Sequence, residues 1–340
     1  MPQAGSRNSL VIGVDIGGTK VAAGLVDHDG GISARSRGPM VARGKATEAL
    51  GAVTSVIDAL FQHNQGACSA IRGIGICSPG PLDPNAGVVI NPPNLPCWRD
   101  FPLAAEVSRT YQLPVRVDND ANAAALAEAL WGAGRGFRNV FCTTLGTGIG
   151  TGLVLDGHVY HGRTGAAGEG GHMSIDYRGP RCTCGKRGCI ETLASGPAIA
   201  KRARLAADLA PGSSMLELAG GNLRNITSEI VGAAYARGDQ VAREVLCETV
   251  DVLTLWLGNI VDLLEPDIII LGGGIAFLLA PFFDEVRDRL PSFCINPRSR
   301  EIPVVPARYG ADVGIAGGAA LCSQMLQNDD NREPLVHSRR

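Results

Sequence analysis

The sequence lacks the features that would direct it to a membrane or a nucleic acid. Only 19% of its 340 residues are charged, and the formal net charge of −2 gives no basis for binding a polyanion or an anionic lipid surface. The first residues, MPQAGSRNSL, are polar and contain no apolar signal core. The most apolar stretch, residues 268–283, is interrupted by three glycines and Pro281, so it is too short and broken to span a bilayer. We therefore expect a cytoplasmic globular protein with neither a nucleic acid nor a membrane as partner.

The sequence also lacks a secretory context for its ten cysteines, which argues against a disulfide framework. One histidine and three cysteines gather in the segment 169–191, and these are His172, Cys182, Cys184 and Cys189. One imidazole and three thiolates form a ligand set typical of structural, tetrahedral Zn²⁺. The alternative is a disulfide with a spare thiol. Glu169 and Glu191 flank the set, either as solvated loop carboxylates or as groups that a zinc loop presents to a polar ligand.

Glycine-rich turns join strand-like runs at two places in the chain. The first turn lies between expected strands at 10–14 and 21–26, and the second between expected strands at 140–145 and 150–155. Strands alternate with helical patterns in both halves. This arrangement predicts an α/β fold of two domains related by an internal duplication, with an interdomain cleft.

The remaining elements follow from periodicity. Further strands are expected at 32–36, 71–77, 115–117, 266–271 and 302–305. Helices are expected at 47–63, 121–130, 281–290 and 312–326 and over most of 197–264. A proline-rich loop covers 78–102 and is a candidate functional loop because of its length. We expect a first domain over 1–119 with the helix 312–326 packed on it, a second over 120–311, and a disordered tail over 327–340.

The two glycine-rich turns are candidate phosphate-binding loops. Glycine lets backbone N–H groups approach an anion closely, and threonine and lysine add donors and positive charge. The first loop contains Asp15, Gly17, Gly18, Thr19 and Lys20, and the second contains Gly146, Thr147 and Gly148. Neither fits the GxxxxGK[ST] pattern. Either turn alone can be a plain β-turn, but equivalent positions in both halves favour phosphate binding. Asp15 is placed to hold Mg²⁺ through water.

A third glycine-rich turn follows the expected strand at 266–271. Gly273 and Gly274 either admit the flat face of a nucleoside or form only a tight strand-to-helix turn.

Together these motifs resemble the ROK family of sugar kinases and repressors. The resemblance covers about residues 10–321 and rests on DIGGTK (15–20), PGPLDP (79–84), DNDANAAALAE (118–128), LGTGIGTGLVLDG (145–157), EGGH (169–172), CTCGKRGCIE (182–191) and LGGGI (271–275). It implies the two-domain hexokinase/actin-like ATPase fold, which is ribonuclease H-like. It further implies ATP with Mg²⁺ as phosphoryl donor, a structural Zn²⁺, and a homodimer or a dimer of dimers.

The resemblance also implies roles for single residues. By local sequence Asp120 is placed to cap the helix 121–130, whereas the NDAN motif of the family places the catalytic base on Asp120 and a sugar contact on Asn119. The other implied sugar contacts are Gly80, Asn94, Glu169, His172 and Glu191. The histidine of the motif binds zinc through one ring nitrogen and faces the sugar with the other.

The function implied by the resemblance is transfer of the ATP γ-phosphate to the 6-hydroxyl of glucose, the glucokinase reaction of glycolysis. Residues 92–98, PPNLPCW, are similar to the NLPGW-type segment of glucokinases, although Cys97 stands where glycine is common. EGGH likewise departs from the usual E-I/L-G-H. The alternatives are an N-acetylmannosamine or N-acetylglucosamine kinase and a sugar-responsive transcriptional regulator. Only nine residues precede Leu10, so we expect no DNA-binding domain of a regulator.

Overall fold

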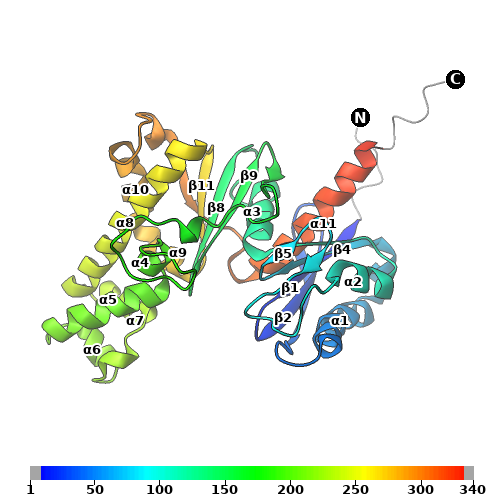
Figure 1. Ribbon diagram of the computed structural model, residues 1–340, viewed down its shortest axis with the longest axis horizontal. Coiled ribbons are helices and arrows are strands. Elements are labelled where there is room, and N and C mark those ends of the chain that lie inside the picture. The colour runs from blue at the N-terminus through cyan, green and yellow to red at the C-terminus, as the bar shows by residue number, and fades with distance from the viewer. Residues whose placement is uncertain (1–8, 333–340) are drawn as a thin grey trace. The chain divides into compact units, whose positions relative to one another are not determined.

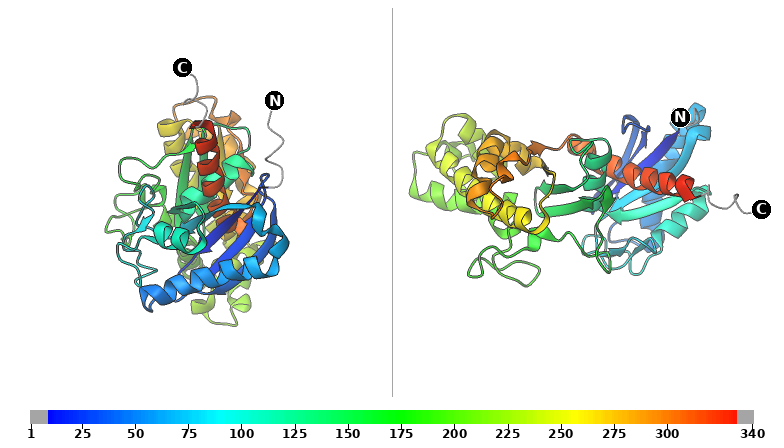
Figure 2. Two further views of the ribbon diagram at one scale, coloured as in Figure 1. Left: turned by 90° about the vertical axis from the view of Figure 1, so that its right-hand side faces the viewer. Right: turned by 90° about the horizontal axis from the view of Figure 1, so that it is seen from above.

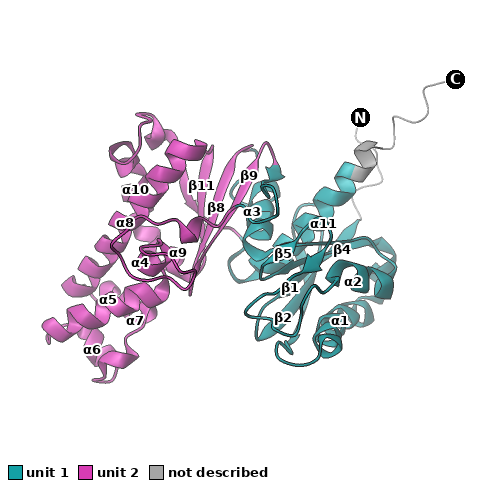
Figure 3. Cartoon of the chain, in the orientation of Figure 1, with its two compact units in different colours: residues 1–136, 158–167, 309–340 teal, residues 137–157, 168–308 magenta. Residues whose placement is uncertain are grey.

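Two mixed β-sheets organise the chain, one in each of two units (Figure 3). The structure is a computed structural model, and it describes residues 9–332. Unit 1 consists of residues 1–136, 158–167 and 309–340, and unit 2 consists of residues 137–157 and 168–308. Each unit combines a sheet with helices, which confirms the predicted α/β class and the two-domain organisation.

The sheet of unit 1 has the order β3-β2-β1-β4-β7. Its strands are β1 (Leu10–Ile16), β2 (Lys20–Val26), β3 (Ile32–Pro39), β4 (Ile71–Ser78) and β7 (Val115–Asn119). The first three strands form an antiparallel meander, and β4 and β7 continue the sheet in parallel with β1. The central strands β1, β2 and β4 are mostly buried, because helices cover both faces of the sheet.

Helices α1 (Ala46–His63) and α2 (Leu103–Tyr111) pack on one face of this sheet, and α3 (Asp120–Leu130) and α11 (Val313–Arg332) pack on the other (Figures 1 and 2). Helix α2 was not predicted, because its short apolar face follows directly on the proline-rich loop. That loop also forms a short antiparallel pair of strands, β5 (Leu82–Asp83) and β6 (Val88–Val89).

Helix α11 lies directly against β1 and β4 because glycines face each other at the contact. A Cβ atom added to Gly75 of β4 would lie 1.7 Å from the carbonyl oxygen of Gly318 in α11. Gly318 is equally close to β1, since a Cβ atom there would lie 2.8 Å from the backbone nitrogen of Val14. The C-terminal helix is therefore an integral layer of unit 1.

The sheet of unit 2 repeats the pattern of an antiparallel hairpin followed by two parallel strands. It contains the hairpin of β8 (Val140–Leu145) and β9 (Ile149–Leu155), then β11 (Ile268–Gly272) and β12 (Val304–Pro306). In unit 1 the hairpin β1–β2 continues through β4 to β7 in the same way. The two sheets thus share a topology, as the repeated glycine-rich turns indicated. The short strand β10 (His158–Val159) opens the inserted segment 158–167.

One hydrophobic core joins the sheet of unit 2 to its helices. The helices are α4 (Glu191–Ala194), α5 (Gly196–Leu209), α6 (Ser214–Leu218), α7 (Ser228–Ala236), α8 (Gln240–Leu264), α9 (Gly274–Leu279) and α10 (Phe283–Arg289). Trp256 of α8 meets the edge of Phe141 of β8 at a ring distance of 5.5 Å. The helical stretch expected over 197–264 is divided into four helices, because glycine-containing turns interrupt it near residues 212, 220 and 238.

Two boundaries differ from the sequence-based expectation. Helix α3 packs against α11 in unit 1, whereas the expected second domain began at Asp120. Helix α11 continues to Arg332, so residues 327–332 of the expected tail are helical, and residues 333–340 lie outside the described part.

Within residues 9–332, none of the helices combines the length and the apolar character needed to cross a bilayer.

Candidate active site

Polar side chains collect where three neighbouring strands of unit 1 end. Asp15 of β1 stands opposite Cys77 of β4, and Ser78 of β4 stands opposite Asn119 of β7. Asp120 follows as the first residue of α3. The carboxyl ends of parallel strands are the usual ligand-binding edge of an α/β sheet. The fold therefore brings the first glycine-rich loop and the predicted catalytic base to the same edge.

Asn119 caps helix α3, which corrects the expectation that Asp120 does so. The Oδ1 atom of Asn119 accepts hydrogen bonds from the backbone N–H groups of Ala121 at 2.9 Å and Asn122 at 3.4 Å. The backbone shows why Asn119 is the cap. Asn119 is extended, as a capping residue is, whereas Asp120 is already helical. The cap uses the amide oxygen, so the Nδ2 donor of Asn119 is available on the side of Gly80, where an added Cβ would lie 3.6 Å from it.

Asp118 is a buried carboxylate beside this pair, and it was not among the predicted site residues. Its side chain is 1% exposed. It accepts hydrogen bonds from the backbone N–H of Asn119 at 2.7 Å and from Nδ2 of Asn122 at 3.1 Å, and it contacts Nε2 of His161. His161 comes from the inserted segment 158–167, and no pattern in the sequence points to its contact with Asp118.

Acidic side chains dominate the electrostatics of this edge. Burial raises the pKa of Asp15, against which the Cys77 thiol and the positive charges of Lys20 and Arg37 act in the lowering direction. Burial, together with the carboxylates of Asp15 and Asp120, raises the pKa of the Cys77 thiol. The Cys77 thiol lies 3.6 Å from Oδ1 of Asp15 and stays protonated.

The first glycine-rich loop is a tight turn packed against the proline-rich segment. The backbone N–H of Gly17 donates to the carbonyl of Lys20 at 2.9 Å. A Cβ atom on Gly18 would lie 3.1 Å from the carbonyl oxygen of Asn94, so the two segments touch. The structure thus brings Asn94, predicted as a sugar contact, next to the predicted phosphate loop.

The second glycine-rich loop is bound to the end of the cysteine-rich segment. The Oε2 atom of Glu191 accepts a hydrogen bond from the backbone N–H of Ile149 at 3.0 Å, and a Cβ atom on Gly148 would lie 2.6 Å from the same oxygen. The N–H of Gly196 donates to the carbonyl of Gly146 at 2.8 Å. Glu191 is therefore part of the loop's framework and not a solvated surface carboxylate.

Glu169 and His172 are fixed by their backbone to strand β9. The short 3₁₀ turn Gly170–His172 starts after Glu169, and the N–H of His172 donates to the carbonyl of Glu169 at 3.0 Å. The hydroxyl of Thr151 in β9 accepts a hydrogen bond from the N–H of Gly170 at 2.8 Å. Gly171 touches β9 so closely that an added Cβ would lie 1.9 Å from the carbonyl oxygen of Ile149.

The four predicted metal ligands converge. The Nδ1 atom of His172 and the thiol sulfurs of Cys182, Cys184 and Cys189 all lie within 4.8 Å of one another. The Cys184 and Cys189 sulfurs are 3.6 Å apart, and the Cys182 sulfur is 3.6 Å from His172 Nδ1. A disulfide needs about 2.05 Å between sulfurs, whereas zinc thiolates at about 2.3 Å from a tetrahedral ion lie about 3.8 Å apart. The arrangement fits a metal and contradicts a disulfide.

The thiols of this cluster differ in their surroundings. Burial, with hydrogen bonds that its thiol donates to the neighbouring sulfurs, raises the pKa of Cys189 to about 12. A hydrogen bond from the backbone N–H of Lys186 lowers the pKa of the exposed Cys184. All ten cysteines lie in the described part of the chain and are free thiols.

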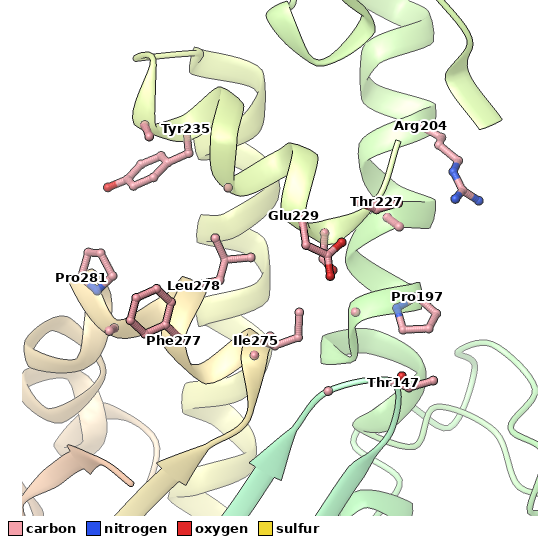
Figure 4. Close-up of a pocket in the computed structure, with 18 residues that line it drawn as sticks. Thr147, Pro197, Arg204, Thr227, Glu229, Tyr235, Ile275, Phe277, Leu278 and Pro281 are labelled. Carbon is pink, nitrogen blue, oxygen red and sulfur yellow. The ribbon is translucent and has the colours of Figure 1, made fainter. Parts of the chain in front are cut away.

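A cavity of about 1050 Å³ opens in unit 2 beside the second glycine-rich loop (Figure 4). Gly146, Thr147 and Gly274 line one part of it, and apolar side chains of α7 and α9 line much of the rest. Gly273 itself serves the turn, because its φ of 87° is in the left-handed region and an added Cβ would lie 2.3 Å from the Leu145 carbonyl oxygen. Gly274 faces the cavity.

Comparison with known proteins agrees with this arrangement. The sequence pattern of the ROK family matches residues 11–325. The chain belongs to the ROK family. A glucokinase of Thermotoga maritima is 33% identical over 317 residues, which cover 93% of this chain and 98% of the relative.

Solved ROK structures share the fold of the chain. A ROK glucokinase from Streptomyces griseus, in complex with glucose and AMPPNP, superposes with a TM-score of 0.75 at 34% identity, covering 92% of this chain and 99% of the other. A ROK transcriptional regulator, a homologue of the E. coli MLC protein, superposes with a TM-score of 0.84 at 26% identity, covering 95% of this chain and 80% of the other. Family membership therefore establishes the fold, while kinases and regulators both occur among the relatives.

Proposed function

We propose that the chain is an ATP-dependent hexose kinase that transfers the γ-phosphate of ATP to the 6-hydroxyl of glucose. The observation that carries the proposal is the position of Asp120 at the carboxyl edge of the unit 1 sheet, with the helix cap supplied by Asn119 instead. The glucokinase relatives, and the glucose and AMPPNP bound in the S. griseus structure, support the choice of substrate and donor.

Asp120 acts as the general base of the reaction. Its carboxylate takes the proton of the 6-hydroxyl as that oxygen attacks the γ-phosphorus, the bond to the bridging oxygen of ADP breaks, and glucose 6-phosphate and ADP leave. Phosphoryl transfer needs little other covalent participation from the protein, so the remaining groups position the reactants and neutralise charge. Gly17, Gly18, Thr19 and Lys20 of the first loop and Gly146, Thr147 and Gly148 of the second supply N–H donors and positive charge to the phosphates.

Recognition of the sugar hydroxyls is assigned to Asn119 and to residues of the proline-rich and cysteine-rich segments. Asn119 donates through Nδ2, and Gly80 and Asn94 contribute from the proline-rich segment. Glu169, His172 and Glu191 bind further ring hydroxyls, with His172 contributing Nε2 because Nδ1 faces the cysteine thiols. Binding of a deoxy sugar would leave one of these carboxylates without its hydroxyl partner, so such a sugar is rejected strongly.

Two metal ions complete the proposal. The Cys₃His donor set fits Zn²⁺ in a closed structural site, where the ion fixes the loop that carries His172 and Glu191. Asp15 fits Mg²⁺ bound through water with the ATP phosphates, and Mg²⁺ supplies charge neutralisation to the transferred phosphoryl group.

The test is a coupled assay of ADP formation with glucose, mannose, N-acetylglucosamine and N-acetylmannosamine at equal conditions. We expect glucose to give the highest kcat/KM. A tenfold or greater preference for an N-acetyl sugar would assign the chain to the amino-sugar kinases. Sugar binding without phosphorylation of any hexose would overturn the kinase proposal and favour the regulator function seen among the relatives.

A further inference from the structure

Helix α7 begins at the second glycine-rich loop. The Oγ atom of Ser228, its first residue, would lie 3.3 Å from a Cβ atom on Gly196. The N–H of Gly196 in turn donates to the carbonyl of Gly146 in the loop at 2.8 Å. The N-terminal end of α7 is thereby joined to the predicted phosphate-binding end of the cavity.

The same helix ends among apolar side chains. One turn after its start, Gly232 faces α9, where an added Cβ would lie 2.7 Å from Cδ1 of Leu278. Near the end of α7 the ring of Tyr235 packs against the ring of Phe282, with centroids 5.6 Å apart. Since a helix advances about 1.5 Å per residue, α7 spans about 10 Å between Ser228 and Tyr235. The cavity is therefore polar at one end of α7 and apolar at the other.

Glu229 is an exposed residue at the start of α7, next to Ser228. It is the second residue of α7, and its carboxylate points into the cavity between Thr147 and Tyr235 (Figure 4). A hydrogen bond from the Thr227 hydroxyl, and one from its own backbone N–H, lower the pKa of Glu229, so it is ionised at neutral pH.

The carboxylate has no cationic partner within residues 9–332. Arg204 is the other charged residue that lines the cavity, and its Nε donates to the carbonyl of Ile226 at 3.0 Å. Glu229 is exposed to the cavity, where water can donate to its two acceptor oxygens and the hydroxyl groups of a ligand can take the place of that water.

The lining of the cavity fits a nucleotide with its phosphates at the glycine-rich loop and its base among the apolar side chains. In that orientation the ribose, which joins the two, would lie beside Glu229. Its 2′- and 3′-hydroxyls are adjacent donors that match the two oxygens of one carboxylate. We propose that Glu229 binds the ribose hydroxyls and makes the chain selective for ribonucleotides over 2′-deoxyribonucleotides. This inference rests on the proposed kinase function and adds the residue that recognises the sugar of the donor.

The experiment measures binding of ADP, 2′-deoxyADP and GDP by calorimetry, so that it does not depend on hexose turnover. The variants are Glu229→Ala and Glu229→Gln, and Glu244→Gln on the exposed face of α8 is the matched control. We expect the unmodified chain and the control to bind ADP about tenfold or more tightly than 2′-deoxyADP, the range of a hydrogen bond to a charged group. In Glu229→Ala the two affinities become equal, and Glu229→Gln lies between.

An unchanged ratio of ADP to 2′-deoxyADP affinity in Glu229→Ala overturns the proposal, as does equal binding of the two nucleotides by the unmodified chain. A variant that changes only the ratio of ADP to GDP affinity also overturns it, because Glu229 would then contact the base. Thermal unfolding shows that each variant is folded. If the ratios behave as expected but no hexose is phosphorylated, the ribose site stands and the kinase function falls. If ADP does not bind, both fall.

Discussion

The Nε2 atom of His161 lies 2.5 Å from Oδ2 of Asp118, whose side chain is almost completely buried. The same carboxylate holds the backbone of Asn119 and the side chain of Asn122. A single buried group thus ties the inserted segment 158–167 to the turn that carries Asn119 and Asp120. The contact between His161 and Asp118 stabilises the fold, and Asp118 directly precedes Asn119, the proposed sugar-binding residue.

Replacing His161 by alanine should destabilise the protein and reduce turnover. The change leaves the buried Asp118 carboxylate with one partner fewer, and loss of a hydrogen bond to a buried group costs about 1–3 kcal/mol. His161 is itself 25% exposed, so we expect the lower half of that range. Urea unfolding measures it. His28→Ala, which removes an exposed histidine paired with Asp29, is the control and should change stability by less than about 0.5 kcal/mol. Equal stability of the two variants would contradict the prediction.

Asp120→Asn should lower kcat by about 10²–10⁴, the usual loss when a general base is removed. Glucose affinity should change only a few fold, because asparagine keeps the size of the side chain and one acceptor oxygen. Steady-state kinetics and equilibrium sugar binding separate the two effects. Asp208→Asn, an exposed position in α5, serves as control. Turnover within about threefold of the unmodified enzyme would remove Asp120 as the base.

Cys184→Ser should remove zinc and, with it, thermal stability and sugar affinity together. Metal binding and ordering of the loop are linked, since the four ligands come from one segment of the chain. Metal analysis of the purified protein should give one zinc per chain, and the variant should give less. Cys247→Ser, on α8 and away from the cluster, should keep the metal. A native protein free of zinc would contradict this prediction.

Two glycine substitutions should act in opposite directions. Gly75→Ala should unfold or strongly destabilise the protein, because its Cβ would lie 1.7 Å from the carbonyl oxygen of Gly318 and force α11 away from the sheet. Gly51→Ala should stabilise it by up to about 1 kcal/mol, because the position is inside α1 and nothing lies within 4 Å of the added methyl group. Thermal melting of both variants is the measurement, and a destabilised Gly51→Ala would show the helix argument to be wrong.

Features were predicted correctly from the sequence where all the residues that define them lie in one short stretch of the chain. The two glycine-rich hairpins, the strand before Asn119 and the gathering of His172 with three cysteines all have this property, since each is fixed within a few dozen residues. That the cluster holds zinc stays a prediction. The cap of α3 was assigned one residue late, because Asn119 and Asp120 are both good capping residues and only backbone conformation distinguishes them.

Contacts between distant segments could not be predicted in this way. His161 reaches Asp118 over 43 positions, and Glu191 reaches Ile149 over 42. Glu229 belongs to a helical stretch in which a glutamate is ordinary. Only its position in the lining of the cavity makes it a candidate ligand-binding residue. Such residues can be recognised as site residues only once the fold shows which residues lie beside them.

The position of α11 has a consequence for how the protein is made. Unit 1 needs residues from 309 onward, and α11 closes the face of the sheet formed by β1 and β4. On the ribosome these strands emerge early, whereas their covering helix emerges last, when every residue of unit 2 has already been synthesised. The first part to be translated is therefore completed after the second, and until then α3 alone is present to cover that face of the unit 1 sheet. A nascent chain released before α11 emerges should depend on chaperones far more than the full chain does.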